Sequence, residues 1–303
     1  MKRDLVSFAL WTGQEIHDVF ALSRRIKNRE LKPFNPLERK SAALIFEEES
    51  LRTRVSFEVG IAQLGGHPIF LQQETIGIST RESVHDIGQV VSQYSELIIA
   101  RTKRHQTCVQ LAESASVPVI NAMTDLVHPC QILADAFTLL EMGKLSPEKR
   151  IVFLGDGNNI ANSWLELAER IPLHLVLSCP SGYEPHQQIL EQAKAAKIST
   201  IEFVEDAREA VKGADVIYTD VWPESRGGIG KGRRATLFKS YQVNKSLLAR
   251  AAKDVLFMHR LPANRGEEVT SEVLDGVRSI VLQQAENRLH VQKGIMGYIL
   301  QRA

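Results

Sequence analysis

The stretch FEEESLRTR, from Phe46 to Arg54, joins the apolar run at 42–45 to a helical pattern. A strand that turns directly into a helix is the repeating unit of α/β proteins. The first N–H groups of such a helix have no partner within it, and the helix dipole is positive there. With two arginines and two hydroxyl side chains added, this turn is expected to hold a phosphate dianion. An N-cap serine followed by two solvated arginines fits the same segment, so both interpretations stay open at this point.

Outward from this turn, short apolar runs alternate with amphipathic helical patterns along nearly the whole chain. The alternation predicts parallel sheets with helices on both faces, in two α/β domains of similar size. Thr12 and Glu15 have capping-box spacing at the start of a first helix that reaches about Ile26. A last helix is expected from Glu286 to Arg302. The expected strands are 42–46, 68–71, 97–100, 118–121, 151–154, 173–178, 201–204, 216–219, 255–258 and 280–282.

Composition limits the classes of function. The chain has 303 residues and a formal net charge of +1, so no global basic field favours nucleic acid as a partner. Three widely spaced cysteines suggest free thiols in a reducing compartment, and neither a signal peptide nor a membrane span is evident, so a cytoplasmic protein is expected. No HExxH, CxxC or GxSxG motif occurs, so we expect no metal, no cofactor and no serine nucleophile of that type.

Several polar clusters fall where strands of the first sheet should end. Arg101 directly follows an apolar run, and His128-Pro129-Cys130-Gln131 opens a helix. Asp135 and Thr138 follow Gln131 at helical spacing. Each side chain alone is more often a solvated charge or a capping residue. Because the ends of parallel strands meet at one edge of a sheet, their coincidence with the turn at Ser50 predicts one site.

The second half has polar residues at corresponding places. Gly155-Asp156-Gly157-Asn158-Asn159 follows a strand, like a dinucleotide-binding turn, but Ile160 follows and the third glycine is missing. A dehydrogenase is therefore a lower-ranked interpretation, and the asparagines are expected to bind a small polar ligand. Asp220, the segment 259–263 and Arg288 follow further strands.

Taken in order, these motifs resemble those of the aspartate and ornithine carbamoyltransferase family, closest to the ornithine branch. The family's Ser-Thr-Arg-Thr-Arg resembles residues 50–54, its His-Pro-x-Gln resembles 128–131, and its Gly-Asp-x-x-Asn resembles 155–159. The segment 286–288 resembles the arginine segment before the family's last helix. The likeness covers essentially the full chain.

The resemblance implies an enzyme that moves the carbamoyl group of carbamoyl phosphate to an amine and releases phosphate, as a homotrimer with active sites at subunit interfaces. It implies a carbamoyl phosphate-binding domain at 1–143, an acceptor-binding domain at 148–286, and a C-terminal helix at 287–303 that returns to the first domain. Asn159, Asp220, Arg260 and Leu261 would contact the amino-acid acceptor. Carbamoyl phosphate would be held by Ser50, Arg52, Thr53, Arg101, His128, Gln131 and Arg288, with Arg52, Thr53, Arg101 and His128 as the catalytic residues.

Some positions depart from the ornithine branch. Arg260 stands where that branch has Cys, Leu51 replaces Thr in the phosphate motif, and the loop after Trp222 lacks Ser-Met-Gly and is rich in glycine and arginine. An arginine there would repel an ammonium group, which suggests an acceptor with an anionic group. Alternatively, Arg260 points toward phosphate or pairs with Glu224, and ornithine is accepted. A catalytically silent member that binds a phosphorylated metabolite as a sensing or interaction subunit also fits.

Overall fold

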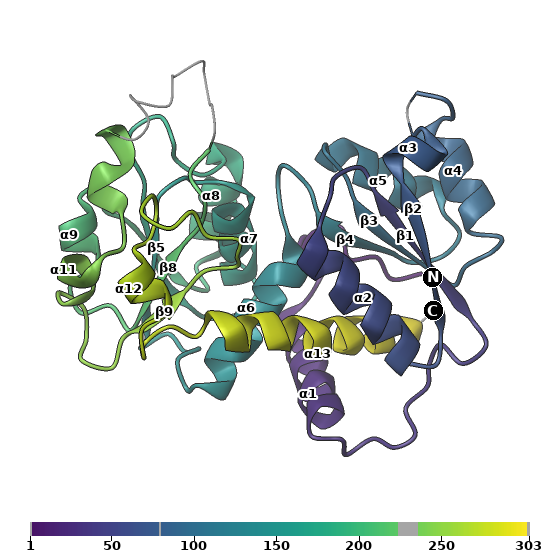
Figure 1. The fold of residues 1–303 in the computed structure, drawn as a ribbon, viewed down its shortest axis with the longest axis horizontal. Coiled ribbons are helices and arrows are strands. Elements are labelled where there is room, and N and C mark those ends of the chain that lie inside the picture. The colour runs from purple at the N-terminus through teal and green to yellow at the C-terminus, as the bar shows by residue number, and fades with distance from the viewer. Residues whose placement is uncertain (1, 79, 224–235, 302–303) are drawn as a thin grey trace. The chain divides into compact units, whose positions relative to one another are not determined.

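The fold is described from a computed structural model, which covers residues 2–78, 80–223 and 236–301 (Figure 1). Two compact units make up the chain. Unit 1 consists of Met1–Phe137 together with Glu286–Ala303, and unit 2 is Thr138–Ala285. No helix in the described ranges combines the length and the apolar character that crossing a bilayer requires.

Unit 1 is built on a four-stranded parallel sheet in the order β2-β1-β3-β4. Its central strands are almost fully buried, which matches their continuous apolar sequence. The strands are β1 (Ser41–Phe46), β2 (His67–Gln72), β3 (Leu97–Arg101) and β4 (Val119–Met123). The helices are α1 (Gly13–Lys27), α2 (Leu51–Gln63), α3 (Gln73–Ile76), α4 (Val84–Val91), α5 (His105–Ser114), α6 (Pro129–Glu141) and α13 (Val281–Leu300).

The predicted capping box of α1 is present, since Thr12 accepts from the Glu15 N–H while the Glu15 side chain accepts from the Thr12 N–H. The C-terminal helix α13 packs across α1 and α2 (Figure 1). At Gly60 of α2 and Gly294 of α13, an added Cβ would come within 3.3 Å of Met296 and 2.0 Å of Ser23. These glycines let α13 pack tightly against the N-terminal helices, so the return of this helix is confirmed.

Unit 2 has a five-stranded parallel sheet in the order β7-β6-β5-β8-β9. The strands are β5 (Arg150–Leu154), β6 (His174–Ser178), β7 (Thr200–Phe203), β8 (Val216–Thr219) and β9 (Leu256–Met258). Helices within its described residues include α7 (Asn159–Ala168), α8 (Gln187–Ala196), α9 (Ala207–Ala210), η1 (Lys239–Tyr241), α11 (Lys245–Leu248) and α12 (Ser271–Leu274). The reversal of strand order beside β5 creates a topological switch point, where such sheets bind ligands.

The prediction of a strand at 280–282 is wrong. Val281 begins α13, five residues before the predicted start of that helix at Glu286. Ser279 forms only an isolated bridge with Phe257. A short apolar run fits a buried strand and the first turn of a buried helix equally well, so periodicity could not separate them.

Candidate active site

The predicted phosphate turn is the start of α2. Ser50 is its N-cap in an extended conformation, and the Ser50 hydroxyl accepts from the Thr53 N–H at 3.3 Å. The capping interpretation is therefore correct. It leaves the hydroxyl proton of Ser50 and the first N–H groups of α2 as donors at the N-terminal end of this helix. Leu51, which departs from the family motif, exposes 73% of its surface and adds no polar group.

Of the two arginines in this turn, Arg54 makes contacts within the fold. Its Nε donates to Glu58 at 2.9 Å, and its guanidinium lies 3.6 Å from the centre of the Phe70 ring. Arg52 is half-buried on the first turn of α2. The solvated-arginine interpretation thus gives way to a packed side chain at one of the two positions.

Thr53 contacts a residue from the opposite end of the chain. An Nη2 hydrogen of Arg288 on α13 is donated to Thr53 Oγ1 at 2.6 Å. The Thr53 and Arg288 residues expose only 2% and 4% of their surface. Because the threonine oxygen accepts from a cation, its own proton is polarised for donation. Two predicted phosphate-binding residues, 235 positions apart, therefore lie together.

Arg101 ends β3 at the carboxyl edge of the sheet. It lies opposite Phe46 on one side and Met123 on the other, where the pairing with β4 shifts register. Its Nη1 donates to Met123 Sδ at 3.2 Å, and its Nη2 lies 3.7 Å from Glu48 Oε2. The register fixes Arg101 at the same sheet edge as the turn after β1, as the sequence predicted.

His128 and Gln131 lie at the start of α6, and each exposes only 1% of its surface. Gln131 Nε2 donates to Asp135 Oδ1 at 2.9 Å, which confirms the predicted helical spacing of four. The Cys130 thiol between them donates to the Asn121 carbonyl, and burial raises its pKa to about 12. Cys130 therefore stays protonated and has a packing role rather than a nucleophilic one.

In unit 2, the turn after β5 places asparagines at the start of α7. Gly155 has φ +115°, and a Cβ on Gly157 would come within 2.2 Å of the Pro185 nitrogen, so this turn requires glycine. Asn158 is the N-cap and accepts from the N–H groups of Ile160 and Ala161. Asn159, predicted to contact the acceptor, is the first residue of α7 and is 9% exposed.

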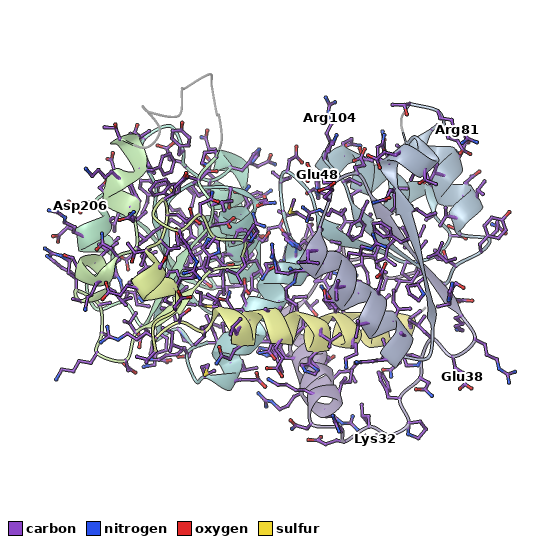
Figure 2. The ribbon with its side chains drawn as sticks, viewed as in Figure 1. Lys32, Glu38, Glu48, Arg81, Arg104 and Asp206 are labelled. Atoms are coloured by element: carbon purple, nitrogen blue, oxygen red, sulfur yellow. The ribbon has the colours of Figure 1, made fainter. Side chains whose placement is uncertain are left out.

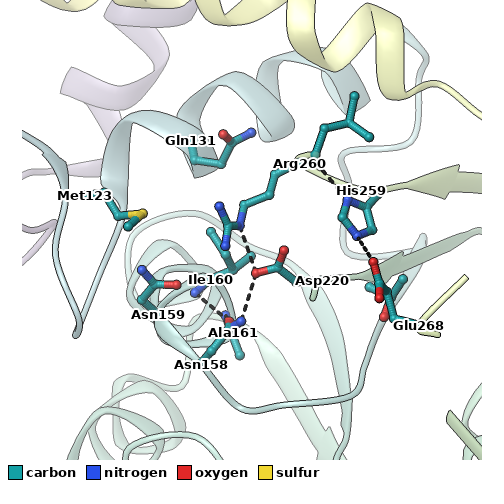
Figure 3. Close-up of polar contacts among 12 residues, drawn as sticks. Met123, Gln131, Asn158, Asn159, Ile160, Ala161, Asp220, His259, Arg260 and Glu268 are labelled. Atoms are coloured by element: carbon teal, nitrogen blue, oxygen red, sulfur yellow. Dashed lines mark hydrogen bonds and ion pairs between the residues drawn. The ribbon is translucent and has the colours of Figure 1, made fainter. Parts of the chain in front are cut away.

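Asp220 is the centre of the polar cluster in unit 2 (Figure 3). Its Oδ2 accepts from Arg260 Nε at 2.8 Å and from Asn158 Nδ2 at 2.9 Å. The residue is 2% exposed, and its buried Oδ1 has no hydrogen-bond partner among the described residues. A buried carboxylate oxygen without a donor is costly, so this atom is well suited to a ligand ammonium group.

Neighbouring strands bring the cluster together. Tyr218 on β8 lies opposite Met258 on β9, so Asp220 and Arg260 leave adjacent strand ends. His259, next to Arg260, is held in place, with Nε2 3.1 Å from Glu268 Oε1 and Nδ1 accepting from the Leu261 N–H (Figure 3). Leu261, another predicted acceptor contact, has φ +59°.

Two contacts were not predicted. Asn158 hydrogen-bonds to Asp220, and Arg260 forms an ion pair with Asp220. Glu224 and the basic loop from Arg226 to Arg234 lie outside the described residues. In the ranges that the structure describes, no group of three or more His, Cys, Asp and Glu side chains is arranged to bind a metal ion.

Comparison with known proteins covers both units. Residues 3–141 match the model of the aspartate/ornithine carbamoyltransferase carbamoyl-P binding domain, and residues 147–299 match that of the Asp/Orn binding domain. The ornithine carbamoyltransferase of Chlorobaculum tepidum is 47% identical, over 97% of this chain and 89% of the relative. That of Geobacter sulfurreducens is 42% identical, over 99% and 100%.

Solved structures agree with the sequence relatives. Ornithine carbamoyltransferase from Pyrococcus furiosus superposes with a TM-score of 0.93 at 39% identity, covering 100% of this chain and 98% of that chain. The enzyme from Thermus thermophilus gives a TM-score of 0.89 at 39% identity, with 99% of each chain covered.

Proposed function

The chain belongs to the aspartate/ornithine carbamoyltransferase family, and we propose that it carbamoylates the side-chain amine of ornithine. As a family member it is a carbamoyltransferase, an enzyme that binds carbamoyl phosphate and an amino acid. The identity of the acceptor and the role of each residue are the content of the proposal.

The ion pair between Arg260 and Asp220 is the observation that favours ornithine as the acceptor. An arginine held at 2.8 Å by a buried carboxylate contributes little net positive charge to the site. It therefore gives a weaker reason for an anionic acceptor than the sequence suggested. The vacant hydrogen-bonding capacity of Asp220 Oδ1 suits the α-ammonium group of an amino acid.

Carbamoyl phosphate would be held in unit 1. The start of α2, with Ser50 and Arg52, would hold its phosphate together with Arg288. Thr53, Arg101 and His128 would donate to the carbamoyl oxygen, and Gln131 would orient the carbamoyl amide. As the neutral amine attacks the carbon, negative charge grows on that oxygen, so these donors bind the transition state most tightly. The phosphate leaves with the C–O bond electrons and can accept the amine proton, so no covalent enzyme intermediate is needed.

Phosphate release measured against a panel of amines tests the acceptor. The panel contains ornithine, lysine, aspartate and glutamate, and citrulline is quantified in the ornithine reaction. We expect ornithine to be carbamoylated fastest. Faster reaction of an acidic amino acid would instead show that Arg260 recognises an anionic group. Absence of phosphate release with every amine would favour the silent, metabolite-binding alternative.

The assembly and cellular location are further parts of the proposal. We infer a homotrimer with active sites at subunit interfaces, on the basis of family membership, and a cytoplasmic location, because all three cysteines are free and buried. Light scattering coupled to gel filtration should give three times the chain mass. A monomeric mass in a fully active preparation would contradict the trimer.

A further inference from the structure

A basic pocket of about 430 Å³ lies in unit 1, and it is lined by none of the residues assigned to carbamoyl phosphate. Its wall comes from the end of α1 and the loop that follows, from the end of α2 and from the middle of α13. Lys27, Arg29, Lys32 and Lys293 line it, and no Asp or Glu does so within the described parts of the chain. Lys32 extends from the loop that follows α1 (Figure 2).

The floor of this pocket is the ammonium group of Lys293. This residue is only 7% exposed, and its Nζ donates to Gln63 Oε1 at 2.7 Å. Burial lowers the pKa of Lys293, and the nearby Arg29 guanidinium lowers it further. An ammonium group has three donors, and a neutral amide cannot compensate its charge. The ammonium group of Lys293 has no ion pair with a carboxylate among the described residues, so an anionic ligand would supply the missing interaction.

The rim supports the same conclusion. Arg29 has φ +59° at the end of α1, a conformation that favours glycine or asparagine over arginine. Lys27 donates to Asn287 Oδ1 at 2.8 Å, so its position is fixed by α13. Like charges gathered around one cavity repel each other unless a ligand of opposite charge enters.

We propose that this pocket binds a small multivalent anion, such as a molecule bearing one or more phosphate groups. Lys293 and Lys27 would contact the anion at the floor and wall, while Arg29 and Lys32 would close over it from the rim. The site is separate from the carbamoyl phosphate site, although α2 and α13 contribute to both. Its volume is within the range of sites that hold small organic ligands.

Calorimetric titration with inorganic pyrophosphate at 150 mM salt tests the proposal, since this salt screens weak attraction to surface charges. Arg52→Ala serves as the background, because it weakens uptake at the carbamoyl phosphate site. We expect one pyrophosphate per chain in this background. Adding Lys293→Met should weaken that binding about tenfold or more, and Arg29→Asn, which suits the backbone conformation, should weaken it less.

Lys194→Met on the exposed face of α8 is the matched control and should leave pyrophosphate binding unchanged. Circular dichroism and carbamoyl phosphate consumption by the single variant Lys293→Met establish that the fold is intact. Pyrophosphate uptake that is lost entirely with Arg52→Ala would overturn the proposal. Binding that is equally strong with and without Lys293 would also overturn it.

Discussion

The two units hold their key arginines in different ways. In unit 1, Arg288 donates to a neutral hydroxyl, that of Thr53, whereas in unit 2 Arg260 donates to the carboxylate of Asp220. A hydroxyl fixes an arginine without cancelling its charge, and a carboxylate cancels most of that charge. The first arrangement suits a dianion. The second suits an amino acid whose ammonium group would donate to Asp220 Oδ1. The two proposed subsites therefore differ in the chemistry of one arginine partner, which is a hydroxyl in unit 1 and a carboxylate in unit 2.

Removal of the hydroxyl in unit 1 should have the largest effect. Thr53→Val keeps the shape of the side chain but removes the acceptor of Arg288 and the proposed donor to the carbamoyl oxygen. We expect kcat/KM for carbamoyl phosphate to fall by about 100-fold to 1,000-fold, measured by phosphate release. Thr200→Val on the exposed β7 is the control. Unchanged kinetics in Thr53→Val would remove this residue from the proposed mechanism.

Neutralising the carboxylate in unit 2 comes next. Asp220→Asn leaves Arg260 with its full charge and offers the acceptor a neutral group. We expect KM for ornithine to rise by about 10-fold to 100-fold, while calorimetric affinity for carbamoyl phosphate stays the same. Asp275→Asn, which breaks an exposed pair with Arg265, should change neither quantity. A loss of carbamoyl phosphate affinity alone would contradict the division of labour between the units.

A cluster formed by Lys144, Asp215 and Asp254 is expected to stabilise unit 2. The Lys144 side chain, 9% exposed, lies 3.1 Å from Asp215 and 2.5 Å from Asp254. Lys144→Met should reduce the free energy of unfolding by about 1–2 kcal/mol, measured by urea denaturation. Lys212→Met, which breaks an exposed pair with Glu209, is the control and should have almost no effect. Equal stability of Lys144→Met and the parent chain would contradict the assignment.

The same cluster predicts a pH dependence. Burial opposes the charge of Lys144, but hydrogen bonds with Asp254 and Asp215 outweigh it and raise its pKa above 10.5. Burial likewise opposes the charge of Asp215, but the Arg150 N–H and the lysines lower its pKa below 3.8. Stabilisation by Lys144 is complete below pH 10.5 and is lost as pH rises through its folded pKa. Stabilisation by Asp215 is complete well above pH 3.8 and is lost as pH falls through its folded pKa.

The smallest effects concern the two helix caps, Ser50 and Asn158. Ser50→Ala and Asn158→Ala should each cost about 1 kcal/mol of stability, measured by thermal unfolding. Ser50→Ala should raise only KM for carbamoyl phosphate, and Asn158→Ala only KM for the acceptor. Asn244→Ala removes the cap of α11 and should reproduce the stability cost without altering either KM. A rise in KM for the acceptor with Ser50→Ala, or in KM for carbamoyl phosphate with Asn158→Ala, would contradict the assignment of one substrate to each unit.

The sequence predicted the sheets well because buried parallel strands are continuous apolar runs with turns at their ends. The turn at Ser50 and the strand end at Arg101 were placed at one edge by this argument alone. The strand expected at 280–282 was wrong because three apolar residues carry no periodicity that excludes a helix.

Contacts between distant side chains were harder to predict. The hydrogen bond from Asn158 to Asp220 depends on Asn158 being the N-cap of α7, and the N–H groups of Ile160 and Ala161 bond to its side chain. The pairing of Asp220 with Arg260 follows from β8 and β9 being neighbours, which alternation of elements does not specify. Had the strand order been known, the two strand ends would have indicated this ion pair.

The contact between Thr53 and Arg288 has a consequence for the growing polypeptide. A ribosome makes Thr53 before Arg288, with all of unit 2 between them. N-terminal domains usually fold first during synthesis, but here most of α13 is made only after unit 2. A nascent chain therefore cannot form the contact between Thr53 and Arg288 until all of unit 2 has been made, so unit 1 is begun first and completed after unit 2.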